Sequence, residues 1–364
     1  MIAEALIDNL ECAVYRIPTD MPEGDGTFEW NATTMIVVNL HAGKTVGTGY
    51  SYVDASAAHL INDTLKATVV GSNALDIDHI GQRLLRQVRN SGRSGIAACA
   101  ISAIDLALWD LKARLLNTSL CQLLGQVRDL VPIYGSGGFT TYSDDVLCQQ
   151  FSRWVHDNGC RFVKMKIGAE PERDPHRILA ARSTIGDAEL FIDANGAFKP
   201  AQSVRFAEAI RQYDVRWFEE PVSSDDEAGL RFVRQSIPPS MEVAAGEYVF
   251  TLDDARRLLS AGAVDILQAD ATRCGGITGF LRIAALAETY HIDISCHCGP
   301  CAHLDVACAL PGLRHIEWFH DHVRIEEILF DGAPKPEDGA IKPDLSRPGN
   351  GLQFKARDAE KYRI

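Results

Sequence analysis

The stretch from Arg161 to Glu219 contains three short β-rich runs, RFVKMKI (161–167), LFIDA (190–194) and VRWFE (215–219). Longer amphipathic stretches separate the runs, and each run is followed by polar residues or glycine. Short apolar runs that alternate with helical segments are typical of parallel strands joined by helical crossovers. The stretch therefore predicts an α/β architecture.

The same alternation extends in both directions and fills residues 131–330. Thr251 and Asp254 fit a capping pair at the start of one of the helical segments. A unit of about 25 residues that occurs eight times predicts a closed (β/α) barrel in preference to an open, doubly wound sheet. The five further β-rich runs lie at 131–136, 241–245, 264–269, 292–296 and 315–319.

The segments on either side of the barrel have a different pattern. Residues 1–130 begin with strand candidates interrupted by a loop at Pro18–Gly26 and then become helical, which predicts an α+β domain. After Glu326 glycine and proline become frequent, so residues 331–364 are expected to form an irregular tail that folds back onto the first domain. The strand candidates of the first domain are Ala3–Arg16, Thr33–Leu40 and Val46–Tyr52.

Composition and charge exclude several classes of protein. The 364 residues include 36 Lys+Arg and 49 Asp+Glu, a net charge of −13, and no basic patch is present for a nucleic acid. The most apolar segment, Gly95–Trp109, is shorter than the roughly 18 residues of a membrane span and contains Asp105. The N-terminus lacks a secretory signal, so we expect a cytoplasmic protein whose ten cysteines are free thiols.

Two lysines lie two residues apart in the run VKMKI (163–167). Side chains alternate between the faces of a strand, so Lys164 and Lys166 are expected to point together into the barrel, near the end that carries catalytic groups. Only Lys199 is a further lysine between residues 131 and 330, which favours burial beside a counter-charge over a solvated pair. A neighbouring ammonium lowers the pKa of a lysine, as a general base requires.

The counter-charge follows at the ends of the next three runs, where Asp193, Glu219 and Glu247 each come after apolar residues. Three carboxylates at one end of consecutive strands repel one another unless a cation lies between them, and all-oxygen ligands favour Mg²⁺. Alternation places Glu220 on the face opposite Glu219, outside this site. Asn195 shares the face of Asp193, and it either lines the site or caps the following helix.

The last three strands supply Asp270, His297 and Glu317. A histidine in an apolar strand is usually a hydrogen-bonded core residue. An aspartate that ends the preceding strand can, however, fix the tautomer of the imidazole and raise its basicity, as in a general acid/base. Glu317 is interpreted as a further catalytic residue, with a simple salt-bridge partner as the alternative.

The segment CHCGPC (296–301) contains a Cys-x-x-Cys, which is found in redox motifs and zinc sites. Alternation places Cys296 and Cys298 on the face opposite His297, so the three side chains are not expected to share a metal. A second Cys-x-x-Cys is absent. The motif is therefore interpreted as incidental to the chemistry.

Together these motifs resemble the enolase superfamily, and within it the mandelate racemase-like group. The resemblance also includes the helical segment ISAIDLALWDLKAR (101–114). It implies a capping α+β domain completed by the C-terminal tail, a modified barrel, Mg²⁺ held by the three carboxylates, and a homo-oligomer. The sister group of muconate cycloisomerase and dipeptide epimerases has a lysine on the sixth strand, where this chain has Gln268-Ala-Asp270.

Residues and resemblance together predict removal of the α-proton of a carboxylic acid through an enediolate, which the cation, Lys164 and a protonated Glu317 would neutralise. Lys166 and His297 come from opposite sides of the barrel, and either could remove the proton. Protonated His297 would assist loss of a β-hydroxyl, so an acid-sugar dehydratase that forms a 2-keto-3-deoxy acid is the preferred function. A racemase or epimerase of a 2-hydroxy acid is the close alternative, and a non-catalytic binding barrel is less favoured.

Substrate choice depends on residues around the mouth of the barrel. The resemblance implies that loops of the capping domain, here Pro18–Phe28 and the region of Tyr50 and Tyr52, close over the site. Polar candidates around the pocket favour a hydroxylated small-molecule substrate. Asn195 and Arg273 are proposed to bind it, and Ser136 and His303 are further candidates.

Overall fold

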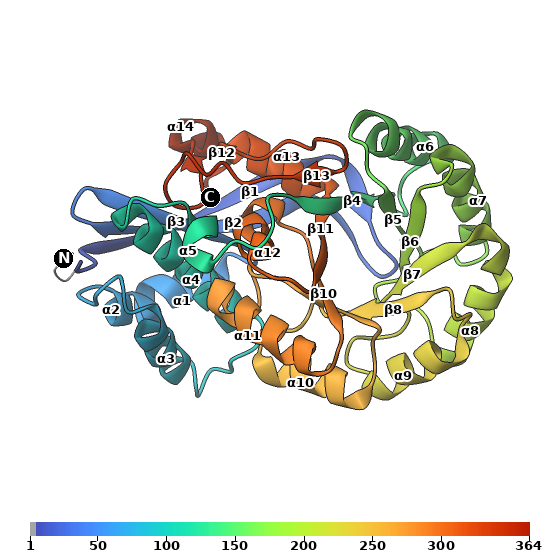
Figure 1. The fold of residues 1–364 in the computed structure, drawn as a ribbon, viewed down its shortest axis with the longest axis horizontal. Helices are drawn as coiled ribbons and strands as arrows, with labels where there is room; N and C mark the ends of the chain where they lie inside the picture. Colours follow the sequence, from blue (N-terminus) through green and yellow to red (C-terminus); the bar gives the residue numbers. More distant parts are fainter. Residues whose placement is uncertain (1–4) are drawn as a thin grey trace.

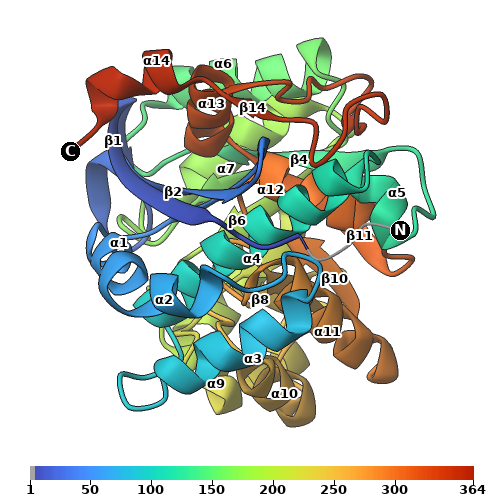
Figure 2. The ribbon, with the colours of Figure 1, turned by 90° about the vertical axis from the view of Figure 1, so that its left-hand side faces the viewer.

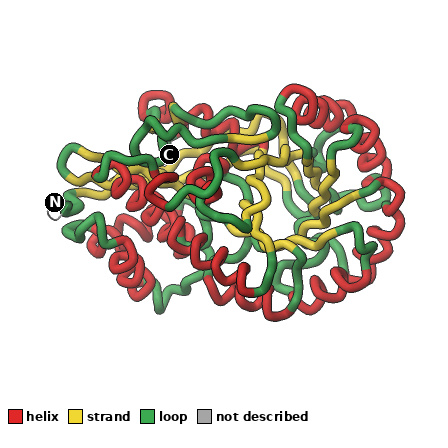
Figure 3. Tube along the Cα trace, in the orientation of Figure 1, coloured by secondary structure: helices red, strands yellow, loops and turns green. Residues whose placement is uncertain are grey.

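Eight parallel strands close into a barrel in the computed structural model, which describes residues 5–364 (Figures 1 and 3). The strands follow one another in chain order, and the last pairs with the first through Ile316 and Ile133. All eight predicted runs are confirmed, with bounds that differ by a few residues. The strands are β4 (Val131–Gly137), β5 (Phe162–Lys166), β6 (Glu189–Asp193), β7 (Val215–Glu219), β8 (Glu242–Ala245), β9 (Ile266–Ala269), β10 (Asp293–Cys296) and β11 (Leu313–Phe319).

Helices connect the strands and cover the outside of the barrel (Figure 1). The predicted capping pair is confirmed: Thr251 precedes its helix, its hydroxyl accepts from the Asp254 amide, and the Asp254 carboxylate accepts from the Thr251 amide. The last helix starts directly after β11, without a loop, so its first residues lie at the mouth of the barrel. The helices are α6 (Asp144–Ser152), α7 (Asp174–Ile185), α8 (Pro200–Ala209), α9 (Glu227–Ser236), α10 (Leu252–Ala261), α11 (Gly276–Thr289), α12 (Pro300–Cys308) and α13 (His320–Leu329).

The first domain is an antiparallel sheet with helices on one side (Figure 2). Gly47 and Gly49 allow β3 to lie directly against α4, because a Cβ at either position would lie within 2.4 Å of a backbone oxygen of that helix. None of the helices in residues 5–364 is long and apolar enough to cross a bilayer. The elements are β1 (Asn9–Gly24), β2 (Glu29–Ala42), β3 (Thr45–Tyr52), α1 (Ser56–Leu60), α2 (Lys66–Val69), α3 (Ile77–Gln87), α4 (Ile96–Leu115) and α5 (Leu120–Leu124).

The loop predicted at Pro18–Gly26 is wrong for most of its length. Strand β1 continues through it to Gly24 and pairs with β2 across a bulge between Pro18 and Glu23. The prolines and glycines suggested a loop, but the cross-strand hydrogen bonds to β2 maintain the strand. The strand candidate at the N-terminus begins with two residues, 3 and 4, that lie outside the described part of the chain, and β1 itself starts at Asn9.

The tip of this hairpin lies over the barrel. A Cβ on Gly26 would be 2.3 Å from the carbonyl oxygen of Ala194 and 2.6 Å from that of Ile167, which follow β6 and β5. Only glycine allows so close an approach of two backbones. The hairpin therefore covers part of the barrel mouth.

The C-terminal tail contacts both parts of the molecule. Strand β13 (Ala340–Ile341) adds to the barrel sheet antiparallel to β4, and β14 (Gln353–Phe354) pairs with β12 (Phe330–Asp331). The last residues, after α14 (Ala356–Ala359), reach the capping sheet, where the Ile364 amide donates to the Val14 carbonyl. The tail was expected to fold back onto the first domain, and it contacts the barrel sheet as well.

Asp110 joins three parts of the chain, which leads to a stability prediction. Its buried carboxylate accepts hydrogen bonds from the Thr48 amide, the Asn350 amide and the Arg114 guanidinium, each at 2.8 Å. Asp110→Ala should lower the free energy of unfolding in urea by about 3–5 kcal/mol, because Arg114 and two amides lose their partner. Glu208→Ala, which breaks an exposed pair with Arg211, is the control and should change it by no more than about 0.5 kcal/mol. Equal effects would contradict the assigned role.

Candidate active site

The structure brings the sequence-predicted residues together at the carboxyl ends of the barrel strands. The catalytic candidates and the three carboxylates are all buried, with exposed fractions of 5% or less. Each comes from the end of a strand or from the residues that directly follow one. They are Lys164 and Lys166 on β5, Asp193 on β6, Glu219 on β7, Glu247 after β8, Asp270 after β9, His297 after β10 and Glu317 on β11.

Asp193, Glu219 and Glu247 form a compact acidic cluster in which one oxygen of each lies within 4.8 Å of the others. Asn195 completes this side of the site, with its Nδ2 atom 3.5 Å from Glu247 and its buried Oδ1 atom without a hydrogen-bond partner. The alternative cap role of Asn195 is wrong, because α8 begins at Pro200 after Lys199. The oxygen-only donor set and the orphaned oxygen fit a hard divalent cation such as Mg²⁺.

Glu220 lies beside this cluster, which corrects the expectation that it faces away. Its backbone has a positive φ of 37°, so the alternation of an extended strand ends at Glu219. Burial, and then the charges of Glu247 and Asp193, raise the pKa of Glu220 well above its usual range. Its Oε1 atom has no hydrogen-bond partner. Glu220 therefore contributes a further oxygen near the acidic cluster.

The two lysines are the cations of the site. The ammonium of Lys164 lies 2.7 Å from Glu219 and 2.8 Å from Glu317, and that of Lys166 lies 2.5 Å from Asp193. Burial lowers the pKa of both lysines, but the carboxylates outweigh it and the pKa of each is raised. The depressed pKa expected from the lysine pair is thus wrong for this arrangement, because each ammonium contacts a carboxylate directly.

His297 and Asp270 form the expected hydrogen-bonded pair, with 2.9 Å between Nδ1 and Oδ2. Thr272 donates its amide to the other Asp270 oxygen and fixes the carboxylate. Burial raises the pKa of Asp270, but the hydrogen bond and charge of His297 outweigh it, so the pKa is lowered. An ionised Asp270 holds the proton of His297 on Nδ1, so Nε2, which lies 3.5 Å from Glu247, is the nitrogen that can exchange a proton with a substrate.

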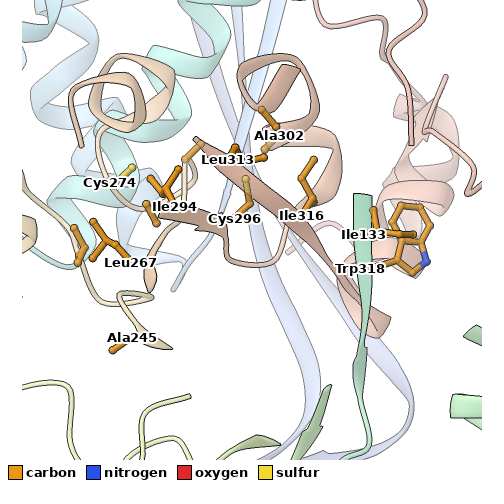
Figure 4. Close-up of a cluster of buried hydrophobic side chains, with 14 of the residues drawn as sticks. Ile133, Ala245, Leu267, Cys274, Ile294, Cys296, Ala302, Leu313, Ile316 and Trp318 are labelled. Carbon is orange, nitrogen blue, oxygen red and sulfur yellow. The ribbon is translucent and has the colours of Figure 1, made fainter. Parts of the chain in front are cut away.

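The Cys-x-x-Cys segment is closer to the chemistry than alternation suggests. Strand β10 ends at Cys296, and Cys298 has a φ of 49°, which turns its sulfur to 3.3 Å from Nε2 of His297. Cys296 instead lies in the apolar layer outside the barrel, near Ile294 and Ile316 (Figure 4). Burial raises the pKa of the Cys298 thiol well above its usual range, so the group is a neutral thiol in this site.

Glu317 is an ionised partner of Lys164, which corrects its expected protonated form. Its carboxylate accepts hydrogen bonds from the Ser136 hydroxyl at 2.6 Å and from the Cys298 amide at 2.8 Å. Burial raises the pKa of Glu317, but Lys164 outweighs it and the pKa lies well below the usual range. The alternative interpretation of Glu317 as a salt-bridge partner thus describes its contacts correctly.

Arg273 and His303, both predicted to line the substrate pocket, lie in different places. Arg273 lies at the site, where it donates to the Glu247 carbonyl at 3.0 Å and packs over the ring of Tyr248. His303 is fully buried away from the pocket, because its ring bonds to the Ala271 amide and the Gly299 carbonyl. Its role is to hold the backbone around Asp270 and His297.

Tyr50 and Tyr52 also differ from their expected role. Both rings are buried between the capping sheet and α13, and both hydroxyls point to the Glu326 carboxylate. Tyr52 stacks on His322, with ring centroids 3.4 Å apart. These tyrosines fasten the capping domain to the barrel and do not close over the site.

A cavity of about 610 Å³ opens beside the acidic cluster and reaches Asn195 and Glu220. Its lining includes Thr27, within the segment Pro18–Phe28 that was expected to close over the site, and residues that the sequence interpretation missed, among them Ser94 before α4 and Tyr248 after β8. Ser94 lies in the glycine-rich segment NSGRSG (90–95), whose composition marks a loop but does not indicate that the loop reaches the barrel. The cavity is large enough for a small polar molecule.

Two family models match the chain. The model described as enolase C-terminal domain-like matches residues 147–359. The model described as the mandelate racemase / muconate lactonizing enzyme, N-terminal domain, matches residues 19–125. The two matches thus cover most of the barrel and of the capping domain.

Proteins similar over most of the chain include sugar-acid enzymes. The 3,6-anhydro-alpha-L-galactonate cycloisomerase of Streptomyces coelicolor is 31% identical, over 95% of this chain and 96% of its own. The L-talarate/galactarate dehydratase of Salmonella typhimurium is 34% identical, over 79% of this chain and 73% of its own. The crystal structure of that dehydratase liganded with Mg and L-lyxarohydroxamate has a TM-score of 0.90 at 27% identity and covers 99% of this chain and 93% of its own.

A solved structure shares more of the sequence. The crystal structure of a mandelate racemase/muconate lactonizing enzyme-like protein from Rubrobacter xylanophilus is 46% identical and has a TM-score of 0.96. It covers 98% of this chain and 99% of its own. The arrangement of capping domain and barrel is therefore shared along the full length.

Proposed function

Since the chain belongs to the mandelate racemase / muconate lactonizing enzyme family of the enolase superfamily, we propose that it removes the α-proton of a hydroxylated carboxylic acid and eliminates the β-oxygen. The observation that carries this proposal is that Lys166 on β5 contacts Asp193 at one side of the acidic cluster, whereas His297 after β10, which bonds to Asp270 after β9, lies 3.5 Å from Glu247 at another. The sugar-acid dehydratase and cycloisomerase among its relatives support it.

Asp193, Glu219 and Glu247 would hold Mg²⁺, with Asn195 and Glu220 beside them. When bound, the ion supplies positive charge that stabilises negative charge developing on the substrate carboxylate. Asp193 also favours the protonated form of Lys166, because its carboxylate lies 2.5 Å from the Lys166 ammonium. A carboxylate shared with a cation attracts the ammonium less, and Lys166 then loses its proton more readily.

Lys164 and Glu317 have positioning and electrostatic roles. The Lys164 ammonium is held by Glu219 and Glu317 and can donate to an oxygen of the substrate carboxylate as the enediolate forms. Glu317 is fixed in turn by Ser136 and the Cys298 amide. These contacts hold the ammonium in place before the reaction, so no reorganisation is needed during it.

The two sides of the site then share the proton transfers. Lys166 or His297 removes the α-proton, according to the configuration of the substrate. His297, protonated on Nε2, donates a proton to the departing β-oxygen while the C–O bond breaks. The enol product converts to a 2-keto-3-deoxy acid by gaining a proton on carbon.

A cycloisomerase is the second candidate, because a relative of this activity matches 95% of the chain. In a 3,6-anhydro sugar acid the β-oxygen is part of a ring. The same α-proton removal and C–O cleavage would open that ring without loss of water. The same residues therefore serve both reactions, and the substrate decides between them.

Incubating the protein with Mg²⁺ and a library of mono- and diacid sugars and anhydro sugar acids should identify the reaction. A dehydratase should give a keto acid, detected with semicarbazide, whose mass is lower by one water. A cycloisomerase should give a keto acid of unchanged mass. Inversion of the α-centre without any keto acid would show a racemase or epimerase and would contradict the proposed elimination, and failure of every acid to exchange its α-hydrogen in D₂O would contradict the shared chemistry.

A further inference from the structure

A second cluster of ligand-type side chains lies where strand β1 contacts the first residue of α13. Asp20 and Glu23 are on β1, in the bulged part of the strand, and His320 is the first residue of α13. One ligand atom of each lies within 4.8 Å of the others. Residues 300 positions apart in the sequence are thus arranged around one point.

Glu23 provides an independent sign that a ligand is missing from this point. Its side chain is completely buried, with an exposed fraction of 0%. One carboxylate oxygen, Oε2, accepts from Trp30 Nε1 at 2.8 Å, whereas Oε1 has no hydrogen-bond partner. Buried carboxylate oxygens without a partner are rare, because each loses its hydration without compensation.

The nearby cation, Arg324, makes no hydrogen bond to Glu23, and its Nε atom also lacks a hydrogen-bond partner. Arg324 is engaged by the Asp321 carboxylate at 2.6 Å and by the Pro18 carbonyl. Asp321 also accepts from the Thr33 hydroxyl. Burial, and then the Asp321 charge, raise the pKa of Glu23 to about 9.

We propose that Asp20, Glu23 and His320 bind a second divalent cation. One imidazole with two carboxylates suits a transition-type ion such as Zn²⁺ or Mn²⁺ better than Mg²⁺, which prefers oxygen ligands alone. His320 Nε2 already lies 3.0 Å from Asp20, so the two side chains approach one another without rearrangement. Asp20 and His320 are partly exposed and leave room for water ligands on the outer side.

The position of the site gives the cation a structural consequence. It would bridge β1 to the first residue of α13, close to the hairpin tip that covers the barrel mouth. Binding should therefore stabilise the hairpin on the barrel and raise the melting temperature in proportion to the logarithm of the free ion concentration.

The test is calorimetric titration of the Mg²⁺-saturated protein with Zn²⁺. The unmodified chain should bind one more ion per chain than either Glu23→Gln or His320→Ala, and Trp30 fluorescence should change with that ion because its indole bonds to Glu23. Each variant should lose at least tenfold in affinity at this site. The matched control is His176→Ala. His176 lies 3.1 Å from Asp144, but no buried carboxylate completes that pair, so this variant should bind Zn²⁺ as the unmodified chain does.

Equal stoichiometry and affinity in the unmodified chain and both variants would overturn the proposal. Anomalous diffraction at the zinc edge provides a second measurement that does not depend on how the variants fold. A peak bonded to Asp20, Glu23 and His320 is expected, and its absence from Zn²⁺-soaked crystals would equally overturn the site. Neither measurement uses turnover, so both are independent of the proposed enzymatic function.

Discussion

Glu219→Gln is expected to reduce turnover by at least about 10³-fold, and excess chelator is expected to abolish the turnover of the unmodified chain until Mg²⁺ is restored. Glutamine removes one of the three buried charges that would hold the ion. Loss of a residue that only supports a ligand typically costs about 10–100-fold, so loss of a ligand itself should cost more. Steady-state kinetics with and without added Mg²⁺ measures both effects.

The same variant should remain folded. Glutamine removes the repulsion between Glu219 and Asp193 but also the ion pair with Lys164, which keeps its contact with Glu317. Trp217 and Gln268 now donate to this side chain at 3.0 Å and can donate to the oxygen of an amide. The increase in melting temperature that Mg²⁺ produces in the unmodified chain should be lost in the variant.

The matched control is Glu242→Gln. Glu242 is the first residue of β8, at the end of the strand opposite Glu247. Glu242 pairs with Arg314 at 2.7 Å, away from the acidic cluster. This variant should keep its turnover and its response to Mg²⁺. Full turnover in excess chelator, or an unchanged Mg²⁺-dependent melting shift in Glu219→Gln, would show that the three carboxylates do not hold a required ion.

His297→Asn should reduce product formation by about 10²–10⁴-fold, as expected for loss of a general acid/base. The effect should be selective. Lys166, on the other side of the site, can still remove an α-proton from a substrate of suitable configuration. The variant should therefore exchange the α-hydrogen for deuterium in D₂O, measured by NMR, without forming keto acid.

Cys298→Ser is the informative control for this prediction, because the sulfur lies 3.3 Å from His297 Nε2. As a neutral thiol it is not needed for proton transfer, and turnover should stay within a few fold. A larger loss in Cys298→Ser than in His297→Asn would favour thiol chemistry or a metal bound by the Cys-x-x-Cys segment. Loss of both exchange and product in His297→Asn would instead assign the α-proton removal to His297.

Local patterns predicted the barrel because they record burial and backbone periodicity. The eight apolar runs mark strands that are buried on both faces, and residues at their carboxyl ends must gather at one mouth once the barrel closes. This geometric requirement is why Lys164, Asp193, Glu219 and His297 could be selected from the sequence. Their identities followed from the chemistry of each side chain, before any contact was known.

The alternation of side chains between the two faces of a strand gave wrong predictions for residues just beyond a strand's end. Glu220 and Cys298 both have positive φ, so their side chains turn toward the site although alternation places them on the other face. Sequence offers no reliable sign of this conformation in a residue other than glycine. It is maintained by the tertiary structure, which in the case of Cys298 places its amide against Glu317.

The sequence by itself determined the barrel, the acidic cluster and the places of Lys166 and His297 at the barrel mouth, since these depend on periodicity and on residue type. Only the tertiary structure decided the protonation of the lysines and Glu317, the interdomain role of Tyr50, and the meeting of Glu23 with His320. Each of these depends on the distance between side chains from separate elements. Electrostatic energies and hydrogen bonds vary steeply over a few ångströms, and no local pattern specifies such distances.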